Sequence, residues 1–183
     1  QQDIGTTYYF LKEVFKTQSP QAVVIDIGST VPEKISEVSA HYSFDYMKLS
    51  LTKIQAVMDR CEKSDWLELI FPFIQYHTRW KEIGEDDFEF LGHDTYNPLM
   101  GFWGYAVVTP GEHPVFSEGV KDVFLDMQTE ELLFGYLERI QELCEENETQ
   151  LIFLKMPYTN AYSINYPMIN SVEKYCSQAE IPF

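Results

Sequence analysis

Residues 22–28 read "AVVIDIG", a short run that is almost continuously apolar, rich in β-branched residues and ended by Gly28. Such a run is typical of a strand buried on both faces, as in a parallel sheet. A second run of this kind, "QLIFLKMP", occupies residues 150–157. We predict that the apolar portions of the two runs, 22–27 and 151–155, lie side by side and point the same way.

Helical patterns separate these strands. Apolar residues recur at helical spacing in 6–17, and 129–148 begins with Thr129, a good N-cap residue, followed by acidic residues. Residues 163–180 form another helical segment, with Pro167 placed in its first turn. The last three residues, "IPF", begin a third strand in this interpretation.

The region between the first strand and Thr129 is less regular. Residues 32–61 are predicted to be helical or loop-helix, with a stripe at i, i+4, i+7 and i+11. Residues 66–83 are also helical in this interpretation, with an interruption near Pro72, and an irregular insertion covers about 84–128. Long insertions of this kind in compact domains are often functional. The stripe consists of Met47, Leu51, Ile54 and Met58.

Alternation of strands and helices predicts one α/β domain over residues 1–183, with a mostly parallel sheet and right-handed crossovers. The chain carries a formal net charge of −16 and no basic run, which argues against nucleic acid or anionic lipid as a partner. Its 3 cysteines form no C-x-x-C motif, so they predict buried free thiols rather than a metal site. We expect no metal and no cofactor.

The carboxyl ends of parallel strands are where ligands bind in open α/β sheets. At 26–30, "DIGST" lacks the lysine and glycine spacing of a nucleotide-binding loop. Backbone N–H groups at Gly28 and Ser29 have two interpretations, an oxyanion site or a simple turn. No G-x-S-x-G motif marks a nucleophile, so the catalytic residues stay unknown.

A second candidate is "YHTRW" at 76–80. In one interpretation Trp80 lies in the core, Arg79 forms a salt bridge and His77 lies at the surface. In the other, His77 and Arg79 face a pocket beside the insertion, where arginine binds carboxylate or phosphate and histidine supplies a hydrogen bond or a proton. His77, Arg79 and Trp80 are therefore the candidate substrate-binding residues.

Several segments together resemble the SGNH/GDSL-like hydrolases of Gram-positive bacteria. They are "TTYYFLKEVFKTQSPQAVVID", "YHTRWKEI…DDF", "YLERIQELCEENETQLIFLKMPY" and "VEKYCSQAEIPF". The resemblance implies a flavodoxin-like fold and esterase or O-acyltransferase activity on cell-surface polysaccharide esters. It also implies an extracellular location and a membrane tether outside this chain. The free cysteines fit a reducing compartment slightly better, and here the resemblance takes precedence.

In that family a serine follows the first strand, and an acid–histidine pair lies near the C-terminus. Neither is present here, so we expect both ends of the domain to lie outside this chain and the chain as given to be inactive. By resemblance, Gly5 and Gly28 are candidates for the oxyanion hole. The alternative is a non-catalytic glycan-binding or scaffolding module of the same fold, in which the aromatic insertion carries recognition. The sequence assigns no oligomeric state.

Overall fold

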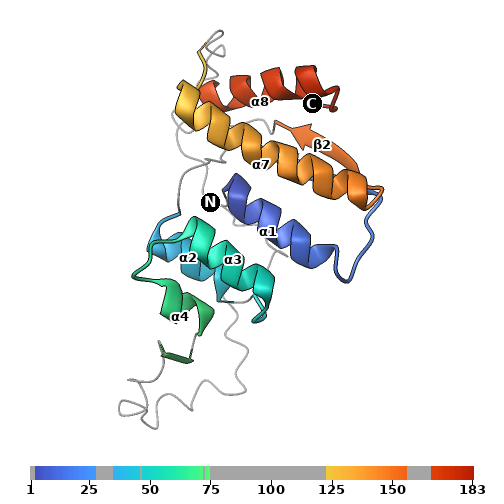
Figure 1. Ribbon diagram of the computed structural model, residues 1–183. Coiled ribbons are helices and arrows are strands. Elements are labelled where there is room, and N and C mark those ends of the chain that lie inside the picture. Colours follow the sequence, from blue (N-terminus) through green and yellow to red (C-terminus); the bar gives the residue numbers. More distant parts are fainter. Residues whose placement is uncertain (1–2, 28–34, 46, 72, 75–122, 156–165) are drawn as a thin grey trace, which may run out of the picture.

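The computed structural model of the chain describes residues 3–27, 35–45, 47–71, 73–74, 123–155 and 166–183. In this part the protein is mixed α/β, with a two-stranded parallel sheet flanked by helices (Figure 1). The predicted α/β class is confirmed at this level. Most of the insertion predicted at 84–128 lies outside the described residues.

Strands β1 (Ala22–Asp26) and β2 (Gln150–Leu154) pair in parallel, with Val24 opposite Ile152. The ladder continues past β1, because the Ile27 amide donates to the Leu154 carbonyl at 3.1 Å. The predicted parallel pairing of the two apolar runs is therefore confirmed.

Only one face of this sheet is covered within the described part of the chain. Ile25 and Phe153 point into the main core, whereas Val24 is 56% exposed. The prediction that β1 is buried on both faces is wrong for these residues, because α1, α7 and α8 all contribute to the one core on the Ile25 side. Period-two alternation in a strand then leaves every second side chain outside that core.

Residues 181–183, predicted to begin a third strand, are not a strand in the structure, but they contact β2 through the backbone. The Phe153 amide donates to the Pro182 carbonyl at 3.0 Å, on the edge of β2 opposite β1. The segment therefore extends the layer beyond β2.

Helix α1 (Ile4–Val14) lies between two hydrophobic cores. Ile4 belongs to the core beneath the sheet, and Tyr9 to the core formed with α2–α4. The helix begins two residues earlier than 6–17 predicts, because the Asp3 carboxylate caps it by accepting from the Thr6 amide. Because α1 is buried on two sides, it connects the layer that contains the sheet with the layer formed by α2–α4.

The second core is built by α2 (Glu37–Phe44), α3 (Leu51–Arg60) and α4 (Trp66–Ile70). Helix α4 ends just before Pro72, where the sequence predicts an interruption. Aliphatic, sulfur-containing and aromatic side chains fill this core: Tyr9, Ala40, Phe44, Met47, Ala56, Val57, Cys61 and Leu69.

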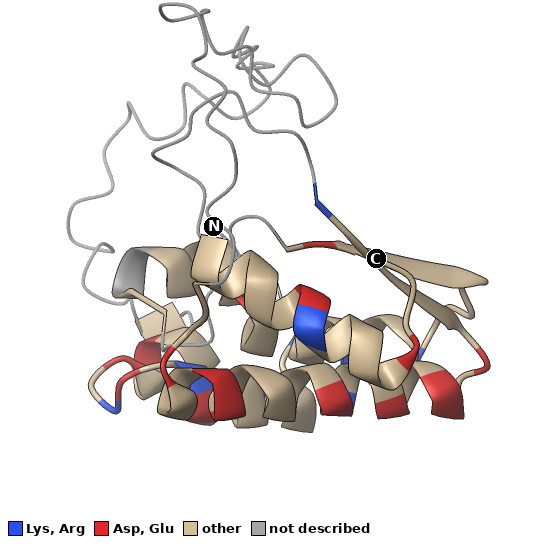
Figure 2. Cartoon of the chain, turned by 90° about the horizontal axis from the view of Figure 1, so that it is seen from above, with Lys and Arg blue, Asp and Glu red and all other residues tan. Residues whose placement is uncertain are grey.

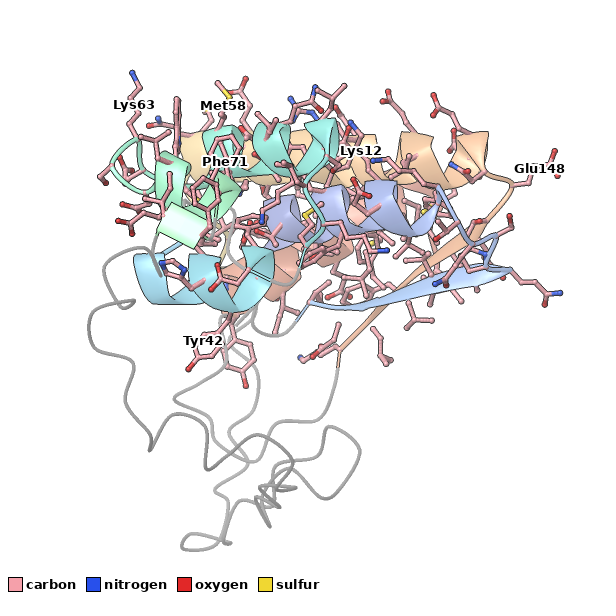
Figure 3. The ribbon with its side chains drawn as sticks, turned by 90° about the horizontal axis from the view of Figure 1, so that it is seen from below. Lys12, Tyr42, Met58, Lys63, Phe71 and Glu148 are labelled. Atoms are coloured by element: carbon pink, nitrogen blue, oxygen red, sulfur yellow. The ribbon has the colours of Figure 1, made fainter. Side chains whose placement is uncertain are left out.

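Helix α3 buries a different face from the predicted one. Leu51 is 80% exposed and Met58 is 49% exposed and projects outward (Figure 3). Met47 is buried, but it precedes the Ser50 cap of α3, so the predicted stripe counted helical spacing across a break. The buried face consists of Thr52, Lys53, Ala56, Val57 and Arg60.

Helices α7 (Met127–Glu146) and α8 (Tyr166–Ala179) complete the layer that covers the sheet. Asp126, not Thr129, caps α7, by accepting from the amides of Gln128 and Thr129. Pro167 lies in the first turn of α8, as predicted.

All three cysteines are buried free thiols, as the sequence predicts. Burial raises the pKa of Cys144 and of Cys176 to about 11. These thiols are therefore packing groups in the two helices. None of the described helices combines the length and apolar character needed to span a membrane.

Candidate functional site between α1, α3 and α7

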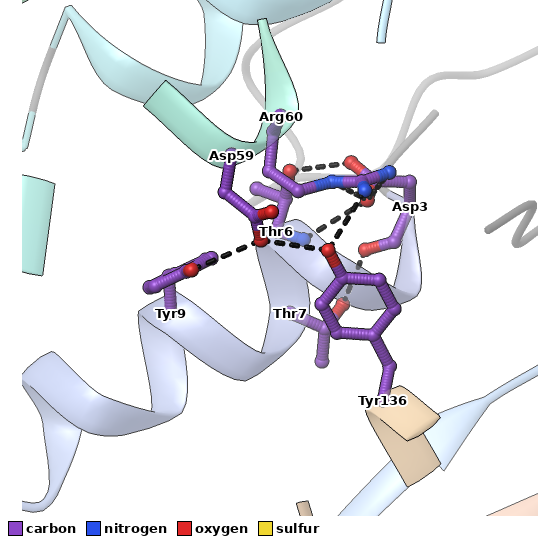
Figure 4. Close-up of polar contacts among 7 residues, drawn as sticks. All are labelled: Asp3, Thr6, Thr7, Tyr9, Asp59, Arg60 and Tyr136. Atoms are coloured by element: carbon purple, nitrogen blue, oxygen red, sulfur yellow. Dashed lines mark hydrogen bonds and ion pairs between the residues drawn. The ribbon is translucent and has the colours of Figure 1, made fainter. Parts of the chain in front are cut away.

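A buried ion pair joins the start of α1 to the end of α3. Asp3 and Arg60 are each 2% exposed. The Arg60 Nε and Nη2 atoms lie 3.0 and 2.9 Å from Asp3 Oδ1. The same carboxylate accepts from the amide and the hydroxyl of Thr6 (Figure 4). Buried charges are tolerated when they are paired and hydrogen-bonded in this way.

A second carboxylate, Asp59, continues this cluster toward the surface. Arg60 Nη1 donates to the Tyr136 hydroxyl at 3.0 Å, and that hydroxyl donates to Asp59 Oδ2 at 2.7 Å. The Tyr9 hydroxyl donates to the same oxygen at 2.9 Å (Figure 4). We call Asp3, Tyr9, Asp59, Arg60 and Tyr136 the polar cluster.

The tyrosines of the polar cluster act as hydrogen-bond donors. Burial, and then the bond to Asp59, raises the pKa of Tyr136 to about 12. The pKa of Tyr9 is raised as well, chiefly by burial and by the Asp59 charge. Both phenols therefore stay protonated at neutral pH and supply neither a base nor a phenolate nucleophile.

The ring of Tyr136 lies close to two cations. The guanidinium carbon of Arg60 lies 5.0 Å from the ring centroid and that of Arg139 lies 5.3 Å from it. Cation–π contacts of this length add to the hydrogen bonds in fixing the ring.

A pocket of about 700 Å³ opens beside the polar cluster. Among the described α7 residues that line it, Tyr136 belongs to the core under the sheet and the others are partly or fully exposed. This position differs from the carboxyl ends of the strands, where open α/β sheets usually bind ligands. Acceptors and donors line it together: Asp59, Gln128, Glu131, Tyr136 and Arg139.

The pocket contains carboxylates, which accept hydrogen bonds, and an amide and a guanidinium, which donate them. It is therefore suitable for ligand groups that both donate and accept hydrogen bonds. Hydroxyl groups are such groups. Among the described residues, no three His, Cys, Asp or Glu side chains are placed to hold a metal ion.

Of the residues predicted from sequence, Gly5 is described. It is buried in the first turn of α1, beneath Arg60. A Cβ atom at this position would lie 2.6 Å from Arg60 Nε, so the absence of a side chain is explained by this packing. Gly28, His77, Arg79 and Trp80 lie outside the described residues.

The sequence patterns did not predict the polar cluster. Asp3 has a local signal, since an Asp three residues before Thr6 at a helix start suggests an N-cap. No local signal connects it with Arg60, which is 57 positions away in the chain. Only the packing of α3 against α1 brings the two together.

Fold and site together define an α/β protein with a parallel sheet and a polar pocket on its helical side. Comparison with protein-family models gave no match, and neither the curated proteins nor the solved structures gave one.

Proposed function

We propose that the chain is part of an SGNH-like domain of flavodoxin-like fold that hydrolyses or transfers acyl groups on cell-surface polysaccharides. The observation that carries the proposal is the parallel, in-register pairing of β1 with β2, with α7 leading directly into β2. Parallel neighbours require a crossover connection, and the resemblance implies that arrangement. A fold of this kind supports this class of chemistry by analogy.

In this proposal the chemistry follows the serine mechanism. A histidine activates the serine, and backbone donors hold the oxyanion of the tetrahedral intermediate. The sequence contains neither the serine motif nor the acid–histidine pair, so we expect this chain by itself to be inactive. Gly28, which follows β1 in the sequence, is the remaining backbone candidate for the oxyanion hole, because Gly5 is buried beneath Arg60.

The test uses the protein made from the complete reading frame, compared with residues 1–183. We expect a fluorophosphonate probe to label one serine of the longer protein, and p-nitrophenyl acetate to be turned over by it alone. Replacement of the labelled serine by alanine abolishes both signals. Absence of labelling and of turnover in the longer protein removes the hydrolase proposal.

A second candidate function is non-catalytic glycan binding on the same fold. The pocket beside Tyr136 favours it, because it combines hydrogen-bond donors and acceptors. Calorimetry with purified cell-wall polysaccharide separates the two: heat of binding without ester turnover supports this candidate. In both cases the proposed setting is the cell surface of a Gram-positive bacterium, with the tether outside this chain.

A further inference from the structure

Gly135 lies in the interior of α7, a helix of 20 residues. Glycine destabilises a helix interior relative to alanine, so an interior glycine needs a packing or functional reason. A Cβ atom built at Gly135 meets nothing within 4 Å among the described residues. Protein packing in the described part therefore does not require glycine at this position.

Gly135 lines two neighbouring hollows along α7. The pocket beside Tyr136 has a neighbour of about 620 Å³, which includes Phe134 and Glu138. Both hollows share Glu131 and Gly135. Because glycine has no side chain, a ligand that passes from one hollow to the other can approach the helix backbone closely.

Hydrogen-bonding groups surround this bare stretch of helix. Glu131 has an exposed side chain, and Asp59 uses Oδ2 to accept from Tyr9 and Tyr136. Arg139 carries a planar set of donors and stands over the Tyr136 ring. The pocket therefore combines acceptors and donors with the exposed helix backbone at Gly135.

We propose that Gly135 forms the floor of a saccharide site on α7, and this inference rests on the proposed carbohydrate function. One sugar ring lies against the helix backbone at Gly135. Asp59 and Glu131 accept hydrogen bonds from its hydroxyls, and Arg139 donates to its oxygens. Gly135 is a specificity-determining residue because any side chain there occupies the space of the ring.

Charge further defines the ligand. Acidic residues recur along α7 (Figure 2), and the chain as a whole carries −16. Two carboxylates face one guanidinium in the larger hollow, namely Asp59, Glu131 and Arg139. Like charges repel across such a surface, so the site takes a neutral saccharide and disfavours a sulfated one.

The experiment follows amide chemical shifts of the intact protein during titration with three probes: maltotetraose, N-acetylated chitotetraose and a heparin tetrasaccharide. We expect at least one neutral probe to shift residues 128–139 and the heparin probe to bind at least tenfold more weakly. Gly135→Met is expected to weaken binding of the neutral probe at least tenfold. Gly135→Ala is the second variant, with a smaller loss.

Folding is monitored by thermal melting of each variant. Both substitutions are expected to leave the melting temperature unchanged or to raise it, because alanine and methionine favour helix. Glu142→Ala, on an exposed position of α7 outside both hollows, is the matched control and keeps wild-type binding. Glu131→Gln is expected to weaken binding severalfold.

Two results would overturn the inference: no neutral probe shifts residues 128–139, or folded Gly135→Met binds as tightly as wild type. Failure here is distinguishable from failure of the hydrolase proposal. Serine labelling with unchanged saccharide affinity in Gly135→Met removes the Gly135 site alone. Saccharide binding at Gly135 without labelling removes the hydrolase and keeps the site.

Discussion

Replacement of Arg60 by methionine tests whether the buried ion pair holds α3 against α1. Methionine keeps a similar length and removes the charge. Asp3, at 2% exposure, is then left as an unpaired buried carboxylate, and Tyr136 loses the donor to its hydroxyl oxygen. Breaking one side of a buried pair costs about 3–5 kcal/mol. Because Asp3 keeps the amide and the hydroxyl of Thr6, we expect about 3 kcal/mol.

A double-mutant cycle isolates the pair. Asp3→Asn removes the negative charge and keeps a side-chain oxygen that caps α1. The double variant, Asp3→Asn with Arg60→Met, removes both charges of the pair. We expect it to be about 2 kcal/mol more stable than the sum of the single effects predicts, within the range measured for contacting residues.

Urea denaturation at neutral pH, followed by far-UV circular dichroism, measures the free energy of unfolding of each variant. Lys63→Met is the matched control, because Lys63 is exposed in the structure (Figure 3) and surface substitutions usually change stability by less than about 0.5 kcal/mol. The reasoning fails if Arg60→Met unfolds like this control, or if the two single effects add.

Three further predictions concern single positions. Gly5→Ala is expected to cost about 1–3 kcal/mol, because its Cβ would lie 2.6 Å from Arg60 Nε. The cost should shrink in Arg60→Met, and a neutral effect in urea unfolding contradicts the packing explanation. Lys53→Met should stabilise by about 1–3 kcal/mol, because Lys53 is only 1% exposed and its ammonium forms no hydrogen bond with a described residue. Burial lowers the pKa of Lys53, so the folded protein binds fewer protons than the unfolded chain just below the unfolded value of about 10.4. The contribution of Lys53 to stability therefore rises with pH up to that value, so the advantage of Lys53→Met over wild type should shrink over the same range; an advantage that does not change with pH contradicts the prediction. Glu148→Gly should stabilise by about 0.5–1 kcal/mol in thermal unfolding, since Glu148 has φ 52° after α7. The control Glu146→Gly, inside the helix, should destabilise instead, and equal effects contradict the assignment.

Close agreement between sequence and structure occurs where the signal is local. The apolar run 22–27 and its partner 151–155 became neighbouring parallel strands, because their length and β-branched content favour buried extended backbone. The positions of α1, α7 and α8 followed from helical spacing in the same way.

Disagreement occurs where burial depends on a partner. Along α3, apolar spacing predicts that Leu51 and Met58 face inward, yet both are exposed while Arg60 is buried. An arginine is buried stably only when its charge is paired with a carboxylate. The partner here, Asp3, lies at the start of a helix more than fifty residues earlier in the chain. The hydrophobic pattern of α3 therefore cannot predict that Arg60 pairs with Asp3.

The amino-acid sequence alone therefore determined the α/β class, the pairing of β1 with β2 and the burial of the free cysteines. Tertiary structure decided which side of α3 is buried, which carboxylates meet Arg60 and Tyr136, and where an open hollow lies beside Gly135. Preferences for helix or strand depend on residues close together in the chain, so they can be predicted from short segments of sequence. Charge pairing and cavities arise only when distant segments come into contact, since their free energy depends on what surrounds each group after packing.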